Sequence, residues 1–282
     1  MRRTGPVEIV RPRDLGEALR EVAAGGRPLA GGTDLFVRVR KGTDASPFLV
    51  DIGGIADLQG VRETETGVEI GAAATHAQIL AHPATERLPV LRLALQTIGS
   101  PALRAMGTLG GNLVNASPAG DGLVPLYLLE ARVNVIGPGG ETSYPVAEFI
   151  LGPGKTALRP GELVRSITVP WPPDGARAYF RKVGRRRALL IAVASLGALL
   201  WLDGETICEA RLALGSVAPT VLRPRAVEQA LVGQPLAVEA LAGLREALSS
   251  AVQPISDLRA SAGYRRQVAG NLLLDLVSLR SV

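Results

Sequence analysis

Two glycine-rich segments are the parts of this sequence best suited to hold a phosphate-bearing ligand. The first is Ala30-Gly31-Gly32-Thr33-Asp34, and the second runs from Thr108 to Asp121. Glycines let a ligand approach the backbone closely, and consecutive exposed amides can bind an anion. Hydroxyl, amide and carboxylate side chains in the second segment could hold sugar hydroxyls. Each segment alone is also typical of an ordinary structural turn, but two of them in one chain favour a dinucleotide whose pyrophosphate is bound from two sides.

Neither segment matches a common nucleotide-binding signature. No Gly-Lys-Ser/Thr follows the first segment, so it is not a Walker loop. The spacing of its glycines also differs from the Gly-x-Gly-x-x-Gly pattern of dinucleotide-binding βαβ units. The residue types in the segments therefore indicate the class of ligand, but they do not identify the fold.

The chain is poor in residues that bind metals. It has one cysteine, Cys208, and two histidines, His76 and His82. A single cysteine excludes internal disulfides and any iron–sulfur cluster held by four cysteines of this chain. Any redox chemistry must come from a bound organic cofactor or from another chain. Cys208 lies in an apolar run, so we expect it to be a buried, inert side chain.

The charge pattern excludes other functions. Lys and Arg number 31 against 26 Asp and Glu, and only three are lysines: Lys41, Lys155 and Lys182. The densest basic cluster is Arg185–Arg187, and aromatic residues make up only 4%, which does not favour a nucleic-acid surface. The longest apolar stretch, 188–202, is short for a membrane span, and no secretory signal is visible, so a cytoplasmic location is expected.

The elements that must position these segments can be read from periodicity and turn residues. Asp14 is placed to cap a helix, and Thr75 a second one. The segment 106–121 shows no helical pattern. The prolines at 170–173 mark the best boundary, after which an antiparallel meander and three helices are expected. The expected strands are 7–10, 48–52, 60–61, 68–71, 132–136, 163–169, 176–183, 191–202 and 207–214; the expected helices are 15–22, 35–40, 77–81, 89–98, 123–130, 224–231, 238–251 and 261–279.

The sequence resembles the FAD-binding medium subunit of the molybdenum hydroxylases, the family of xanthine dehydrogenase, carbon monoxide dehydrogenase and aldehyde oxidoreductase complexes. Residues 30–34 and 108–112 resemble the two pyrophosphate motifs of that family, and 115–121 continue the second motif. The resemblance also covers 70–76, 180–187, and 254–261 with 264–266. It extends over essentially the whole chain in the expected order.

This resemblance implies an α+β fold with a two-subdomain FAD-binding domain of the vanillyl-alcohol-oxidase (PCMH) type, at 1–55 and 56–172. A C-terminal antiparallel sheet with helices would follow at 173–282. FAD would be bound noncovalently, and the chain would carry neither a catalytic residue nor a metal ligand. The residues implied for pyrophosphate and ribose binding are Leu29, Ala30, Gly31, Gly32, Thr33, Asp34, Thr108, Leu109, Gly110, Gly111 and Asn112. Thr75, in the segment 70–76 that resembles the flavin-proximal segment of the family, is implied as a further cofactor-binding residue.

Five further residues receive roles from the same resemblance. Asn115 and Asp121 would hold the ribityl or ribose side of FAD, and Leu163 and Val164 would form apolar walls. Lys182 would approach the pyrimidine end of the isoalloxazine, where a cation stabilises the anionic reduced ring.

The implied function is electron transfer within a complex. Molybdopterin would lie on a large partner subunit and 2Fe-2S clusters on a small one, in a heterotrimer or its dimer. Electrons would pass through FAD to NAD, quinone or oxygen. Ile98 lies near the place where some members carry an aromatic residue, and Arg185–Arg187 would face a partner or form a solvated turn. Two alternatives are a self-contained FAD oxidoreductase and a non-redox nucleotide-binding assembly module.

Overall fold

The computed structural model describes residues 7–44, 46–184 and 191–281, and the fold is α+β, as expected. The chain divides into two compact units that interleave along the sequence. Unit 1 comprises Met1–Ala84, Ser100–Asn115 and Ala131–Pro170, and unit 2 comprises Thr85–Gly99, Ala116–Glu130 and Trp171–Val282. The division at residues 55 and 172 stays a prediction, and Arg185–Arg187 lie outside the described residues. No helix among those residues is long and apolar enough to cross a membrane.

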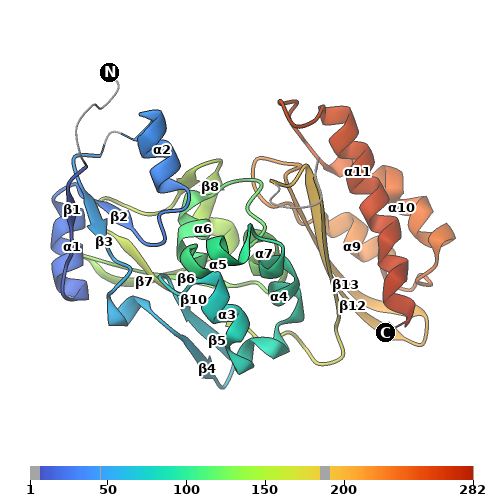
Figure 1. Ribbon diagram of the computed structural model, residues 1–282. Helices are drawn as coiled ribbons and strands as arrows, with labels where there is room; N and C mark the ends of the chain where they lie inside the picture. The colour runs from blue at the N-terminus through green and yellow to red at the C-terminus, as the bar shows by residue number, and fades with distance from the viewer. Residues whose placement is uncertain (1–6, 45, 185–190, 282) are drawn as a thin grey trace. The chain divides into compact units, whose positions relative to one another are not determined.

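A small parallel sheet begins unit 1 (Figure 1), with strand order β1-β3-β2. Helix α1 connects β1 to β2 and begins where expected, because the Asp14 carboxylate accepts the Glu17 amide at 2.7 Å. Its apolar face packs with the buried Val50 and Ile52. The elements are β1 (Ile9–Val10), α1 (Leu15–Ala23), β2 (Arg27–Leu29), α2 (Leu35–Lys41) and β3 (Leu49–Asp51).

A five-stranded antiparallel sheet forms the rest of the unit 1 framework, in the order β4-β5-β10-β6-β7. Ile167 of the central strand pairs with Ile70 on one side and Val133 on the other, and all three are buried. Strand β7 was not expected, because its sequence is polar and lacks the alternation of a half-buried strand; it lies exposed at the sheet edge. The strands are β4 (Val61–Thr64), β5 (Gly67–Gly71), β6 (Arg132–Gly137), β7 (Gly140–Pro145) and β10 (Leu163–Pro170).

Unit 1 also contains short helices, and two of them were not expected: one at 101–106 and one within 106–121, where the sequence shows no helical pattern. Ser100 caps one helix by accepting the Leu103 amide at 3.2 Å. The other contains Gly110-Gly111, although each glycine disfavours a helix by about 1 kcal/mol. Packing outweighs that local preference here. The remaining elements of unit 1 are α3 (His76–Ala81), α5 (Pro101–Met106), α6 (Leu109–Asn115), α8 (Val146–Phe149), β8 (Ile150–Gly152) and β9 (Lys155–Thr156).

Unit 2 is built on the expected antiparallel meander, β11-β12-β13. Alternate residues of β12 point to opposite faces. One set, including Leu196, packs with α9, α10 and α11 (Figure 1), whereas Gly197 on the other face meets Val124 and Leu128 of α7. The elements are α4 (Pro89–Gln96), α7 (Leu123–Leu128), β11 (Arg177–Val183), β12 (Ala194–Asp203), β13 (Thr206–Gly215), α9 (Arg225–Leu231), α10 (Val238–Ala251), α11 (Ala262–Leu274) and the 3-10 segment Asp275–Ser281.

Cys208 is exposed on β13, so the expectation of a buried side chain is wrong. It lies beside the hairpin turn, where the pairing register of β12 and β13 shifts between Trp201 and Leu202. The expectation rested on the apolar run around Cys208, but at this irregular point of the pairing the side chain is exposed.

A buried ion pair ties α9 to the sheet. The Glu228 carboxylate accepts the Leu212 amide at 2.7 Å and the Arg223 Nε at 3.0 Å. Both charged side chains are more than nine-tenths buried. Each therefore depends on the other for the interactions that it would otherwise make with water.

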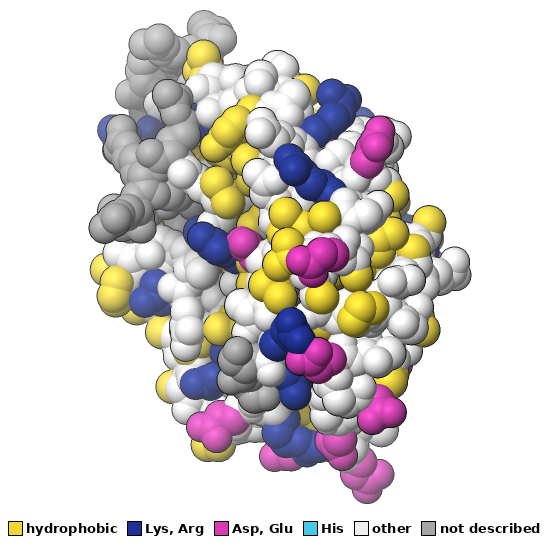
Figure 2. Space-filling view, turned by 90° about the vertical axis from the view of Figure 1, so that its right-hand side faces the viewer, with side chains coloured by type: hydrophobic (Ala, Val, Ile, Leu, Met, Phe, Trp, Pro, Cys, Tyr) yellow, Lys and Arg dark blue, Asp and Glu magenta, His cyan; other side chains and the backbone are white. Residues whose placement is uncertain are grey.

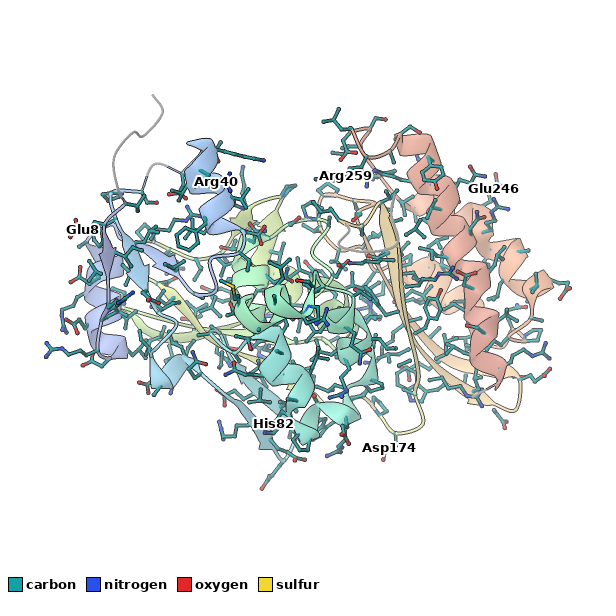
Figure 3. All side chains as sticks on the ribbon, in the orientation of Figure 1. Glu8, Arg40, His82, Asp174, Glu246 and Arg259 are labelled. Carbon is teal, nitrogen blue, oxygen red and sulfur yellow. The ribbon has the colours of Figure 1, made fainter. Side chains whose placement is uncertain are left out.

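We expect Glu228→Gln to lower the free energy of unfolding by about 3 kcal/mol, the usual cost of leaving one partner of a buried pair uncompensated. Urea denaturation would measure the change. Glu246→Gln, on the exposed face of α10 (Figure 3), is the matched control and should change stability by less than about 0.5 kcal/mol. Equal unfolding midpoints for the two variants would contradict the structural role of the pair.

Candidate cofactor-binding site

Unit 1 brings together three of the segments singled out in the sequence. The Gly110 amide donates to the Ala72 carbonyl and the Leu109 amide donates to the Ala74 carbonyl, both at 3.2 Å. The His76 amide donates to the Gly107 carbonyl at 2.9 Å. These bonds join the segment that follows β5 to the start of α6.

The third segment, which follows β2, approaches the same place through glycine. A Cβ atom on Gly31 would lie 1.8 Å from the Met106 carbonyl oxygen, and one on Gly110 would lie 2.4 Å from the Ala72 oxygen. Gly32 has a φ of +68°, in the left-handed region that favours glycine. Because backbone meets backbone at these points, no other residue fits without displacing the main chain.

The turn between β2 and α2 leaves its amides open. In the part of the chain that the structure describes, the amides of residues 31–34 donate to no protein acceptor. Hydrogen bonding resumes at Phe36, whose amide donates to the Gly32 carbonyl at 3.0 Å. Asp34 occupies the cap position of α2, but its side chain makes no capping hydrogen bond. Consecutive open amides of this kind can hold an anion.

The second glycine segment supplies side chains as well as backbone. Thr108 Oγ1 accepts the Gly111 amide at 3.0 Å and so fixes the first turn of α6. Asn112 Oδ1 is buried and has no hydrogen-bond partner in the protein. A buried acceptor without a donor carries a free-energy cost that a bound hydroxyl or amide group would remove.

Arg38 is a residue that the sequence did not single out. Its Nη2 donates to Asn115 Oδ1, which links α2 to the end of α6. The two residues are 77 positions apart, so no local pattern joins them. The available signal was the position of Arg38 one helical turn after Asp34, on the same face as the end of the first glycine segment.

Thr75 and His76 connect the remaining segment to this cluster. Thr75 forms a capping box with Gln78 and an isolated antiparallel bridge with Thr108. His76 is 3% exposed, and a Cβ on Gly107 would lie 3.3 Å from its Cδ2. Burial, and secondarily the positive charge of Arg104, lowers the pKa of His76 to about 4. The ring is therefore neutral near pH 7 and packs beside the entry to the second motif.

Leu163 and Val164 lie on β10, just before Arg165, whose carbonyl accepts the Ala72 amide at 3.0 Å. Both side chains are buried, and Leu163 packs into the core of unit 1 together with Ala73. Leu29 is also buried, at the end of β2. Their contacts with a cofactor stay predictions.

Unit 2 contains the other two expected residues, and it pairs them. Lys182 Nζ lies 2.6 Å from Asp121 Oδ2 and 2.7 Å from the Thr97 carbonyl oxygen, next to Ile98. Burial raises the pKa of Asp121, and the attraction of Lys182 limits that rise. Asp121 Oδ1 is buried without a partner in the protein. The pair fixes a cation in place and keeps one carboxylate oxygen available.

Comparison with known proteins identifies the family. A family model described as "FAD binding domain in molybdopterin dehydrogenase" matches residues 5–172. A second, "CO dehydrogenase flavoprotein C-terminal domain", matches residues 178–278. The chain belongs to the FAD-binding medium subunits of the molybdenum hydroxylases.

Similar proteins extend over nearly the whole chain. The glyceraldehyde dehydrogenase medium chain of Sulfolobus acidocaldarius is 34% identical, with 92% of each chain covered. The carbon monoxide dehydrogenase medium chain of Afipia carboxidovorans is 33% identical, over 95% of this chain and 94% of the relative. The solved carbon monoxide dehydrogenase of Hydrogenophaga pseudoflava matches with a TM-score of 0.92 and 30% identity, covering 98% of both chains.

The described residues fit the FAD that this family binds. FAD carries a pyrophosphate, which needs several donors and no bulky side chains, and the open amides beside Gly31 provide them. It also carries hydroxyl groups, which suit the buried acceptor Asn112 Oδ1 of the same unit. Among the described residues, no group of three or more His, Cys, Asp and Glu could hold a metal ion.

The close approach at Gly31 can be tested by adding one methyl group. Gly31→Ala places a Cβ against the Met106 carbonyl and should separate the two segments, so we expect at least a tenfold loss of FAD affinity. Gly54→Ala is the matched control, because nothing lies within 4 Å of its added Cβ. Flavin fluorescence titration of the apoprotein would measure both. Equal FAD affinity for the two variants would rule out a pyrophosphate site at the Gly31 contact.

His76 should make stability depend on pH. The unfolded chain binds a proton near pH 6.5, whereas folded His76 does so only near pH 4, so stability falls as the pH drops between these values, by about 3 kcal/mol in all. His76→Phe removes this dependence while keeping a ring. The difference in free energy of unfolding between wild type and variant, measured from pH 7 to pH 4, should shrink by that amount. A constant difference would show that His76 titrates normally.

Proposed function

We propose that this chain is the FAD-binding electron-transfer subunit of a molybdenum hydroxylase complex. The observation that carries the proposal is the open run of amides at residues 31–34, placed against the start of the second glycine motif by glycine contacts. Membership of the FAD-binding family supports it. When bound, FAD supplies the redox chemistry, and this chain binds and orients it.

Within this proposal the protein residues have distinct tasks. Backbone amides of 31–34 bind the pyrophosphate, Gly31 lets the first glycine segment approach Met106, and Gly110 lets α6 approach Ala72. Asn112 accepts a hydrogen bond from a sugar hydroxyl, and Asn115 does so while Arg38 orients its side chain. The remaining positions carried over by resemblance are Leu29, Ala30, Thr75, Thr108, Leu109, Gly111, Leu163 and Val164.

We assign a separate task to the ion pair of unit 2. Asp121 orients the Lys182 ammonium and accepts a hydroxyl with its other oxygen. A cation held at the pyrimidine end of the flavin ring would stabilise negative charge there, because the Lys182 side chain is mostly withdrawn from water. The assignment to the ring rests on the family resemblance of these two residues.

The metal centres of the complex would lie on other chains. We propose a large molybdopterin-binding partner that oxidises the substrate and a small partner that carries 2Fe-2S clusters, in a heterotrimer or its dimer. One cysteine and two histidines cannot ligate such clusters on this chain. NAD, quinone or oxygen would then take the electrons, and the cytoplasmic location stays a prediction.

Co-purification of this chain with the proteins that its neighbouring genes encode tests the function. We expect a yellow protein with one FAD per copy of this chain, released by mild denaturation, and a molybdenum-containing chain in the same particle. Cofactor analysis and native mass spectrometry would measure both. FAD without any molybdenum-containing partner would favour the self-contained oxidoreductase. A colourless chain that does not respond to FAD would favour the non-redox assembly module.

A further inference from the structure

The segment 254–266 is a sequence motif to which the cofactor site gives no role. It begins with an irregular loop, Pro254–Ser261, and continues into α11. Ser261 caps the helix by accepting the Tyr264 amide at 3.2 Å. One turn later, Arg265 points back into the protein and is 3% exposed.

Arg265 fixes the loop to the end of the sheet where β12 begins and β13 ends. Its Nη1 donates to the Val193 carbonyl at 2.6 Å, just before β12, and to the Ser216 carbonyl at 3.1 Å, just after β13. Its Nη2 donates to Asp257 Oδ1 at 2.7 Å. One guanidinium therefore holds three separate segments of unit 2.

The Asp257 carboxylate in turn fixes the loop by accepting hydrogen bonds from the loop's own backbone. Its carboxylate accepts the Arg259 amide at 2.8 Å and the Ala260 amide at 3.2 Å. Burial opposes the charged form, but these bonds and those from Arg265 and Arg259 outweigh it and hold the pKa of Asp257 well below its usual range. The loop is thus fixed by charge-assisted hydrogen bonds.

The same loop presents apolar side chains to solvent. Leu258 is 97% exposed and Ile255 is 71% exposed, on either side of the Asp257 anchor. Tyr264, beside Arg265, is 50% exposed, and Ile191, two residues before Val193, is 53% exposed. A loop whose backbone is held by charge-assisted hydrogen bonds yet which exposes its aliphatic residues is preorganised for binding, because little backbone freedom remains to be lost.

The charges around these residues are one-sided. Residues 253–270 contain three arginines and a single acidic residue, Asp257, which gives a net charge of +2. Arg259, labelled in Figure 3 beside the N-terminal end of α11, shares Asp257 with Arg265, and Arg266 is exposed. The face of the molecule drawn in Figure 2 carries apolar, basic and acidic side chains side by side.

We infer that Ile255 and Leu258, with Tyr264 and Ile191 around them, form a docking surface for a partner subunit that presents an apolar pocket edged by carboxylates. This inference rests on the proposed function, which requires partner subunits. A second copy of this chain is a poorer occupant, because a twofold symmetric contact would place two surfaces of charge +2 against each other.

Leu258→Glu tests the inference, since a side chain that is 97% exposed can be changed without disturbing the fold. In the reconstituted complex we expect at least a 30-fold loss of affinity for the partner, as for a central interface residue. The melting temperature and the FAD content of the chain should not change. The matched control is Leu151→Glu, 64% exposed in unit 1, which should assemble like wild type.

Arg266→Glu tests the charge complementarity separately and should weaken assembly more at low salt than at high salt. Wild-type affinity for Leu258→Glu would overturn the inference. So would a homodimer of the isolated chain that Leu258→Glu dissociates in analytical ultracentrifugation, because the occupant would then be a second copy. A wild-type chain that binds FAD but no partner subunit would overturn the proposed complex, and this inference with it.

Discussion

Contact between main chains at Gly31 and Gly110 is the constraint on which the organisation of unit 1 depends. Two β-strand ends and the start of a helix meet where no Cβ atom could fit. The contact has two consequences: it fixes the distance between the segments, and it removes the side chains that would otherwise cover the amides. Rigidity and access to the backbone thus have one physical origin, which explains why both segments are rich in glycine.

The sequence predicted well those features that depend on residues close together in the chain. The caps at Asp14 and Thr75 act within three residues, and each helix begins beside its cap. The meander of unit 2 was predictable because its strands are apolar and joined in order. The helix through Gly110-Gly111 was not, since its local propensity is poor and the Ala72 backbone that it contacts belongs to a distant segment of the chain.

In the candidate site, too, some features could be predicted from the sequence and others could not. Its glycine segments could be found from composition and spacing, because the required backbone chemistry leaves a local trace. The bonds that orient its side chains leave none: Arg38 reaches Asn115 across 77 positions, and Lys182 reaches Asp121 across 61. The type of basic side chain at a position, arginine or lysine, matches the hydrogen-bond partners that the structure shows there. Arg265 satisfies three acceptors from different segments with its planar fork, whereas Lys182 places a compact charge on one carboxylate and one carbonyl.

Buried polar atoms without protein partners occur both inside and outside the candidate site. Among the described residues these atoms are His76 Nδ1, Asn112 Oδ1, Asp121 Oδ1, Ser216 Oγ and Arg265 Nε. Each unpaired atom costs about 1–3 kcal/mol, a large fraction of the stability of a typical domain. In unit 1, a ligand with hydroxyl groups would complete the hydrogen bonding of Asn112 Oδ1 and remove that cost. Binding of such a ligand would therefore also stabilise the fold.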